Sequence, residues 1–134
     1  EIAGVAYYND SKATNTDSAI KALEAFDGHI ILIAGGDDKL TDLGAFMELV
    51  HARVDELILV GDAAERFAAA ARDAGIPEAQ IHRVGYHMEK AVQLARELAA
   101  AGQIVLLSPA CASFDMYGGY EERGRDFKRL VNEL

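Results

Sequence analysis

Residues 30–39 read Ile-Ile-Leu-Ile-Ala-Gly-Gly-Asp-Asp-Lys, and this stretch decides the fold. Its first five residues are all apolar, which is typical of a strand buried on both faces of a parallel sheet. The glycine pair ends the strand and leads into a polar turn. Four further runs of strand character occur elsewhere in the chain: Val5 to Tyr8, Glu56 to Val60, Ile81 to Val84 and Ile104 to Leu107.

Stretches with helical periodicity separate these strands. The first has its apolar face on Leu23 and Phe26. Three polar residues are placed to cap its start: Thr14, Asn15 and Thr16. The third opens with Asp62 and Glu65 at the spacing of a capping box and stops at Gly75. The alternation of strands and helices predicts an α/β, Rossmann-like fold, with a mostly parallel sheet and helices on both faces.

Size and charge limit what the chain is. At 134 residues with 51% hydrophobic content it has enough apolar residues for one core, so we expect residues 1–134 to be one domain. The formal net charge of −9 argues against a protein that binds the phosphate backbone of nucleic acids, because affinity for that backbone depends on many cationic contacts. Any anion must instead be bound by local lysines and backbone amides.

Cysteine content and hydropathy indicate the compartment. The single cysteine, Cys111, excludes an internal disulfide and fits a reducing environment. No apolar run approaches the roughly 20 residues of a membrane helix, and the chain opens without a signal peptide. We therefore expect a cytoplasmic protein without membrane contact. Because the chain lacks an initiator methionine and enters a strand almost at once, we also expect a piece of a longer protein.

Three polar segments each follow a predicted strand: residues 10–15, 35–39 and 108–115. Successive strands of a parallel sheet point the same way, so the three segments gather at one edge and form a single site. Two of them carry a lysine and the third carries two serines. This combination predicts a site for a small anionic molecule.

Each segment, taken alone, has a plainer structural explanation. Lys12 stands at a helix N-terminus, where free N–H groups favour an anion, but capping with a solvated lysine explains the same residues. Lys39 follows a glycine pair that matches no phosphate-binding loop motif, and an ordinary strand-to-helix turn accounts for it equally well. Ser113 and the glycines at 118–119 form either a carboxylate-binding loop or a surface loop before a capped helix.

Taken together, the segments resemble a known family. Asn-Asp-Ser-Lys-Ala-Thr-Asn at 9–15, Ala-Gly-Gly-Asp-Asp-Lys at 34–39 and Leu-Ser-Pro-Ala-Cys-Ala-Ser-Phe-Asp at 107–115 are followed by Tyr-Glu-Glu-Arg-Gly-Arg-Asp-Phe at 120–127. In this order they resemble the C-terminal domain of the bacterial Mur ligases, in their D-glutamate-adding branch. The resemblance covers essentially the whole chain.

The resemblance implies an ATP-dependent amide synthesis in peptidoglycan assembly. The carboxylate of UDP-N-acetylmuramoyl-L-alanine is phosphorylated, and the amine of D-glutamate attacks the acyl phosphate. ATP and Mg²⁺ are implied as cofactors, held mainly by a central domain, while an N-terminal domain holds the UDP sugar. The partners implied for this chain are therefore the three substrates and its own two preceding domains, and the isolated domain is expected to be inactive.

The resemblance also implies roles for individual residues. Lys39 and Thr14 are expected to bind the α-carboxylate of D-glutamate. Ser113 and the backbone of Tyr120 are expected to bind its side-chain carboxylate, with Phe114 lining the pocket. Two separated anion sites of this kind suit a dicarboxylate.

The nucleotide side of the site has its own expected residues. Lys12 is similar to the lysine that approaches the reacting phosphate, which makes it the expected catalytic and ATP-binding cation, and Asp10 is similar to the acid near the ATP ribose. No metal ligand is expected on this chain, because its histidines lack metal-ligand spacing. Leu40 departs from the family pattern, in which a small residue often follows the lysine, and this puts the shape of that loop in question.

Two other interpretations stay open. The chain is also compatible with the C-terminal domain of another Mur or folylpolyglutamate-type ligase, which adds a different amino acid. It is also compatible with a freestanding α/β ligand-binding or regulatory module that has no ligase partner.

Overall fold

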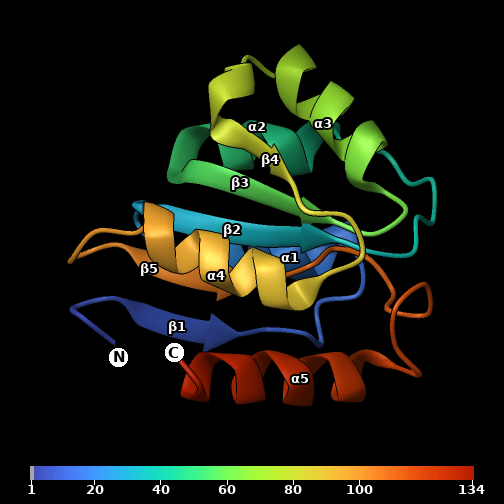
Figure 1. Ribbon diagram of the computed structural model, residues 1–134. Coiled ribbons are helices and arrows are strands. Elements are labelled where there is room, and N and C mark those ends of the chain that lie inside the picture. Colours follow the sequence, from blue (N-terminus) through green and yellow to red (C-terminus); the bar gives the residue numbers. More distant parts are fainter. Residues whose placement is uncertain (1) are drawn as a thin grey trace.

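The computed structural model describes residues 2–134 (Figure 1). Its strands are β1 (Ala6–Asn9), β2 (Ile30–Gly35), β3 (Val54–Val60), β4 (Ile81–Arg83) and β5 (Ile104–Leu107). Its helices are α1 (Thr16–Glu24), α2 (Gly44–Arg53), α3 (Ala64–Asp73), the short 3₁₀ helix η1 (Glu78–Gln80), α4 (Met88–Leu98) and α5 (Tyr120–Asn132). The strands match the predicted runs to within two residues at each end.

All five strands run parallel in the order β1-β5-β2-β3-β4, which confirms the predicted α/β, Rossmann-like fold. The arrows in Figure 1 point the same way, so the loops that follow the strands lie together at one edge. The last strand in sequence, β5, lies between β1 and β2, because Val105 pairs with Tyr7 on one side and Ile31 on the other.

The apolar run that defines β2 is buried on both faces. Ile30 and Leu32 belong to the core beneath α1, α2 and α3, whereas Ile31 and Ile33 belong to the core beneath α4 and α5. Alternate side chains of a strand point to opposite faces, so each face receives half of the run. The helices that follow β1, β2 and β3 cover one face, and those that follow β4 and β5 cover the other.

Helix starts were predicted less well than the strands. α1 is capped by Asn15, whose side chain accepts from the N–H of Ser18 at 2.9 Å, which selects one of the three candidates. The capping box predicted for α3 is wrong. The residue at its N-cap is Ala63 and makes no side-chain cap bond, while the Asp62 carboxylate accepts a hydrogen bond from the Tyr86 hydroxyl instead.

No helix among the described residues is long and apolar enough to cross a membrane.

Candidate functional site

The three polar segments lie at the carboxyl ends of β1, β5 and β2, which are neighbours in the sheet. The chain continues to one face after β1 and β2 and to the opposite face after β5 (Figure 1). Neighbouring strands whose connections diverge in this way leave a crevice at their carboxyl ends, where ligands of open α/β sheets bind. The topology therefore brings the three segments together at one edge of the sheet, as the sequence predicted.

The loop after β5 joins the other two loops by backbone hydrogen bonds. Ala110 donates its N–H to the carbonyl of Ala13 at 3.0 Å, and on the other side Asp37 donates to the carbonyl of Ala112 at 2.9 Å. Loops that share hydrogen bonds of this kind keep a fixed spacing. The candidate residues on the three loops are therefore held in one arrangement.

The loop after β3 also packs against these three loops, and a glycine makes the close contact possible. A Cβ at Gly61, where φ is +74°, would lie 2.2 Å from Oδ2 of Asp115, so a side chain at position 61 has no room. The N–H of Asp62 donates to the same carboxylate oxygen at 3.0 Å. Burial raises the pKa of Asp115, because the charged form loses solvation there.

A buried arginine on α5 is hydrogen-bonded to both the loop after β1 and the loop after β5. Arg123, which is 2% exposed, donates from Nε to the Ser11 hydroxyl at 2.9 Å and from Nη2 to the Ser11 carbonyl at 2.7 Å. Its Nη1 donates to the carbonyl of Cys111 at 3.0 Å. The Ser11 hydroxyl in turn donates to the carbonyl of Tyr120, at the first turn of α5, at 2.6 Å.

Sequence reasoning did not single out Arg123. It stands four residues before Phe127 and seven before Leu130, both buried. That spacing puts all three on one helix face, which was the available signal. Burial lowers the pKa of Arg123, because desolvation penalises its charge.

On the loop after β1, the residue that caps α1 is not one of the residues expected to contact a ligand. Because Asn15 caps α1, Thr14 is not needed for that role. Lys12 is exposed and makes no ion pair within residues 2–134. Asp10 is held by the Ser108 hydroxyl, which donates to its Oδ2 at 3.0 Å.

Lys12 lines a hollow of about 330 Å³ on the outer side of the site. Arg125 and Lys128, one turn apart on α5, line it too, and Glu121 is its one acidic lining residue. None of the three cations has an ion-pair partner in the described part of the chain. In a chain of net charge −9, three cations around one hollow favour an anionic ligand or surface.

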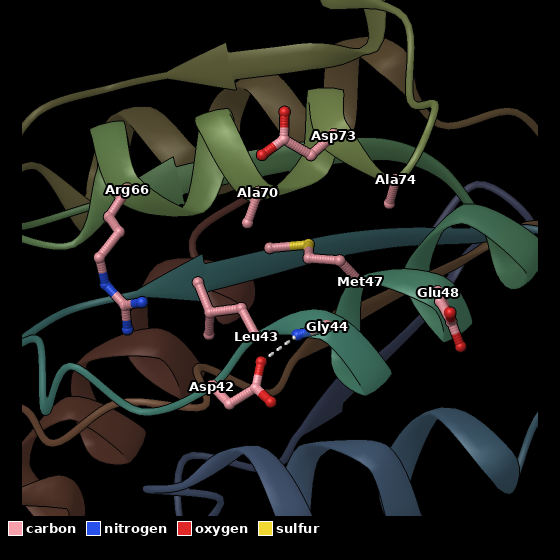
Figure 2. A pocket seen from close by; sticks show the side chains of 9 residues that line it. All are labelled: Asp42, Leu43, Gly44, Met47, Glu48, Arg66, Ala70, Asp73 and Ala74. Carbon is pink, nitrogen blue, oxygen red and sulfur yellow. Dashed lines mark hydrogen bonds between the residues drawn. The ribbon is translucent and has the colours of Figure 1, made fainter.

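On the loop after β2, Lys39 is exposed. Its two neighbours, Asp38 and Leu40, are each held by hydrogen bonds. Asp38 is paired with Arg66 of α3, and the N–H of Leu40 donates to the Asp38 carboxylate at 2.9 Å. Behind this loop lies a hollow of about 380 Å³ between α2 and α3, lined in part by Leu43, Met47 and Arg66 (Figure 2).

On the third loop, the serine and the aromatic residues differ sharply in exposure. Ser113 is 2% exposed, and its hydroxyl has no hydrogen-bond partner in the described chain. Phe114 is 69% exposed and Tyr120 is 37% exposed. A buried hydroxyl without a partner is unusual, because it loses its bonds to water without replacement.

Cys111, on the same loop, is buried. Burial raises the pKa of the Cys111 thiol to about 12, so it is a packed thiol rather than a nucleophilic thiolate at neutral pH. Residues 2–134 contain no group of three or more histidine, cysteine, aspartate or glutamate side chains placed to hold a metal ion.

Comparison with known proteins identifies the family. Residues 1–111 match the family model described as "Mur ligase, glutamate ligase domain". The chain belongs to this family. Its match ends before Ser113, so likeness beyond Cys111 depends on individual relatives.

Individual relatives align with nearly the whole of this chain. A protein of Thermoanaerobacter sp. (strain X514) is 48% identical over 134 residues, which is 100% of this chain and 29% of the relative. A protein of Clostridioides difficile (strain 630) is 46% identical over 97% of this chain and 28% of its own length. One of Geotalea uraniireducens (strain Rf4) is 47% identical over 100% of this chain and 28% of its own length. Each is named UDP-N-acetylmuramoylalanine--D-glutamate ligase, and this chain spans less than a third of each.

Proposed function

We propose that residues 1–134 are the C-terminal, amino-acid-presenting domain of an ATP-dependent ligase that adds D-glutamate to UDP-N-acetylmuramoyl-L-alanine. The reaction belongs to cytoplasmic peptidoglycan synthesis. The observation that carries the proposal is the hydrogen bonding among the three loops, from Ala110 to Ala13 and from Asp37 to Ala112, at the crevice where the strand connections diverge. The names of relatives 46–48% identical to the chain support the choice of substrate.

D-Glutamate would be held by its two carboxylates. Lys39 is exposed and without an ion-pair partner in the described chain, and with Thr14 it is suited to the α-carboxylate. Ser113 supplies an unpartnered hydroxyl for the side-chain carboxylate, together with the backbone N–H of Tyr120 at the start of α5. Phe114 would cover the ligand, which accounts for so exposed an aromatic side chain.

The nucleotide would approach from the side of the first loop. Lys12 would neutralise charge on the reacting phosphate, and Arg125 and Lys128 would add to the field around it. Asp10, oriented by Ser108, would accept from a ribose hydroxyl. Mg²⁺ would be held mainly by a central domain of the ligase, as the resemblance to the family implies.

The chemistry needs the amine of D-glutamate next to an acyl phosphate. Attack by the amine on the acyl carbon places negative charge on the carbonyl oxygen before phosphate leaves. Fixed carboxylate contacts orient the amine, and the Lys12 ammonium stabilises the growing charge on the phosphate side. Separation of these residues from the preceding domains would leave the site incomplete, so the isolated domain is expected to be inactive.

The first test is ADP formation by the complete ligase with UDP-N-acetylmuramoyl-L-alanine and a panel of amino acids. The panel contains D-glutamate, L-glutamate, L-lysine, diaminopimelate and D-alanyl-D-alanine. Turnover with D-glutamate alone supports the proposal. Turnover with another amino acid favours a different Mur or folylpolyglutamate-type ligase, and no turnover with any of them favours a freestanding binding module.

A further inference from the structure

Arg66 lies outside all three motif segments, and the proposed reaction gives it no role. It stands in the first turns of α3 and extends toward the loop that carries Lys39 (Figure 2). Its Nε donates to Oδ2 of Asp38 at 2.8 Å and its Nη2 to Oδ1 at 2.9 Å. Two parallel bonds of this kind fix both the distance and the orientation of a carboxylate.

The carboxylate of Asp38 also fixes the residue on the far side of Lys39. Its Oδ1 accepts from the N–H of Leu40 at 2.9 Å. The Asp38 side chain therefore bonds to the backbone two residues ahead, and Lys39 lies between the two bonded residues. Leu40 has a φ of +57°, in the left-handed region that a leucine seldom adopts. Because Leu40 is 77% exposed, packing does not hold it in that conformation. The hydrogen bond that the Leu40 N–H donates to Asp38 does, and Arg66 holds Asp38.

The pair also decides which charge Lys39 encounters. Asp38 is adjacent to Lys39 in sequence, so a free carboxylate there would attract the lysine ammonium and repel an incoming carboxylate. The hydrogen bonds from Arg66 lower the pKa of Asp38, so its carboxylate stays ionised. The positive guanidinium also balances the negative charge of that carboxylate. Lys39 is then left free for a ligand.

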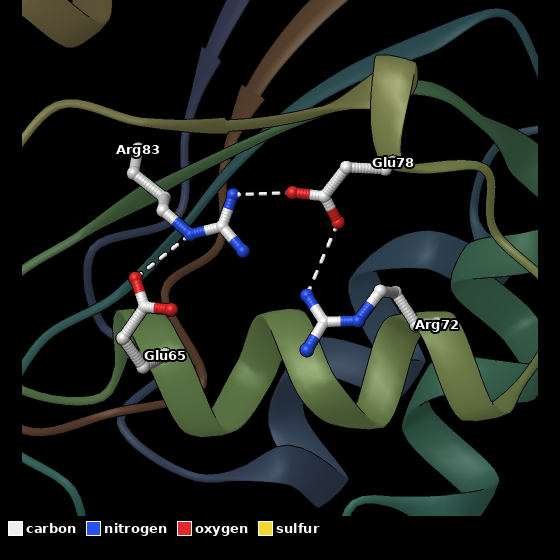
Figure 3. A network of polar contacts seen from close by, with 4 residues as sticks. All are labelled: Glu65, Arg72, Glu78 and Arg83. Carbon is white, nitrogen blue, oxygen red and sulfur yellow. Dashed lines mark hydrogen bonds and ion pairs between the residues drawn. The ribbon is translucent and has the colours of Figure 1, made fainter.

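Arg66 can act in this way because α3 is itself held in place. Arg83 of β4 donates to Glu65 of α3 at 2.7 Å and to Glu78 of η1 at 2.8 Å (Figure 3). Glu78 also accepts from Arg72, near the end of α3, at 3.1 Å. These exposed pairs are individually weak, but together they join both ends of the helix to the neighbouring strand and turn.

We propose that Arg66 is a positioning residue for the amino-acid carboxylate site: through Asp38 it holds the Lys39 loop in its binding shape and keeps the Asp38 charge away from Lys39. This inference rests on the proposed role of Lys39. It also answers the question that Leu40 raised, because the loop shape depends on the Asp38–Arg66 pair and not on a small residue after the lysine.

The test compares variants of the complete ligase by steady-state kinetics with D-glutamate as the varied substrate. Arg66→Gln should raise the KM for D-glutamate about three- to tenfold, the range expected for loss of one partly buried charge pair, with kcat within about twofold. Adding Asp38→Asn should recover the part of that loss that comes from the free carboxylate, because asparagine carries no competing charge and can still accept from the Leu40 N–H. An Arg66→Gln enzyme with an unchanged KM, or a double variant worse than the single, overturns the inference.

A matched control separates positioning from general damage to α3. Arg72→Gln makes the same substitution on the same helix, away from the Lys39 loop. It removes only one of the three exposed pairs that hold α3, and a single exposed pair contributes little, so the KM should stay unchanged. Hydrogen exchange should show a faster Leu40 amide in Arg66→Gln but not in Arg72→Gln, and equal rates in both would count against the proposal. Lys39→Ala tests the underlying function separately: if it leaves the KM unchanged, the role of Lys39 fails, whereas a raised KM with an unaffected Arg66→Gln enzyme rejects only the role of Arg66.

Discussion

Arg123 donates from Nε to the hydroxyl of Ser11 at 2.9 Å, although the two residues are 112 positions apart in the chain. All three hydrogen-bond acceptors of the buried guanidinium are neutral: the Ser11 hydroxyl, the Ser11 carbonyl and the Cys111 carbonyl. The arginine thus joins the loop before α1 to the loop after β5. A charge is desolvated to make this connection, which indicates that the relative position of the two loops matters.

Replacing Arg123 by Met should therefore destabilise the fold. The change removes a charge that is expensive to bury, but it leaves two carbonyls and a hydroxyl short of donors, and we expect a loss of about 2–4 kcal/mol in the free energy of unfolding. Urea denaturation of the chain measures it. Arg125→Met, on the exposed side of the same helix, should change stability by less than about 0.5 kcal/mol. Equal effects of the two substitutions would show that the buried contacts contribute little.

Gly61→Ala should separate steric exclusion from backbone strain. At Gly61 a Cβ would lie 2.2 Å from the Asp115 carboxylate, whereas at Gly102, where φ is +93°, it would meet nothing within 4 Å. Both substitutions strain a left-handed backbone, so Gly102→Ala gives the strain alone. We expect Gly61→Ala to lose about 1–3 kcal/mol more than Gly102→Ala in thermal or urea unfolding. No difference between them would mean that the Asp115 loop moves aside freely.

Cys111 should resist alkylation as long as the chain is folded. Burial raises the pKa of its thiol to about 12, so the thiolate is scarce at pH 8 and iodoacetamide has little access. Mass spectrometry should show no added mass on the native chain within minutes and complete labelling in concentrated urea. Rapid labelling of the native chain would show that the loop after β5 opens readily.

The Asp38–Arg66 pair predicts a specific pH dependence. Because the hydrogen bonds from Arg66 lower the folded-state pKa of Asp38, the pair stabilises the fold above the unfolded pKa of about 3.9 and loses this contribution as the pH falls through the folded-state value. Asp38→Asn should cost at most about 1 kcal/mol at pH 7, since Arg66 is partly exposed. Urea midpoints of wild type and variant should converge as the pH is lowered toward 3. If the difference between the two urea midpoints stayed constant with pH, the loss of stability in Asp38→Asn would come from packing and not from the charge of Asp38.

The fold was predictable because its signals are local. The apolar run at 30–34 and the polar turns after each strand identify a parallel sheet, and a parallel sheet brings those turns to one edge. Which residue caps α1 was not decided by the sequence, because Thr14, Asn15 and Thr16 all have suitable side chains. The structure assigns the cap to Asn15.

The supporting arginines were missed because their partners are distant. Arg66 lies 28 positions from Asp38, and the Ser11 that binds Arg123 lies 112 positions away. A sequence shows that a charge is present but not what it meets, and the usual expectation for a charged helix residue is exposure to solvent. Motif residues were found because their segments resemble those of a known family, whereas these contacts appear only once the loops are folded together.

Ser113→Ala should have opposite effects on stability and binding. The Ser113 hydroxyl is buried without a partner among residues 2–134, so its removal should leave the free energy of unfolding unchanged or raise it slightly. If the hydroxyl instead binds the side-chain carboxylate of D-glutamate, the same substitution in the complete ligase should weaken that binding by about 1–3 kcal/mol, which appears as a higher KM. Ser108→Ala is the matched control, because the Ser108 hydroxyl already donates to Asp10 and its loss should reduce stability. An unaltered dependence on D-glutamate in Ser113→Ala would mean that the serine only packs, and a large loss of stability would mean that its hydroxyl finds a partner in the folded chain without the ligand.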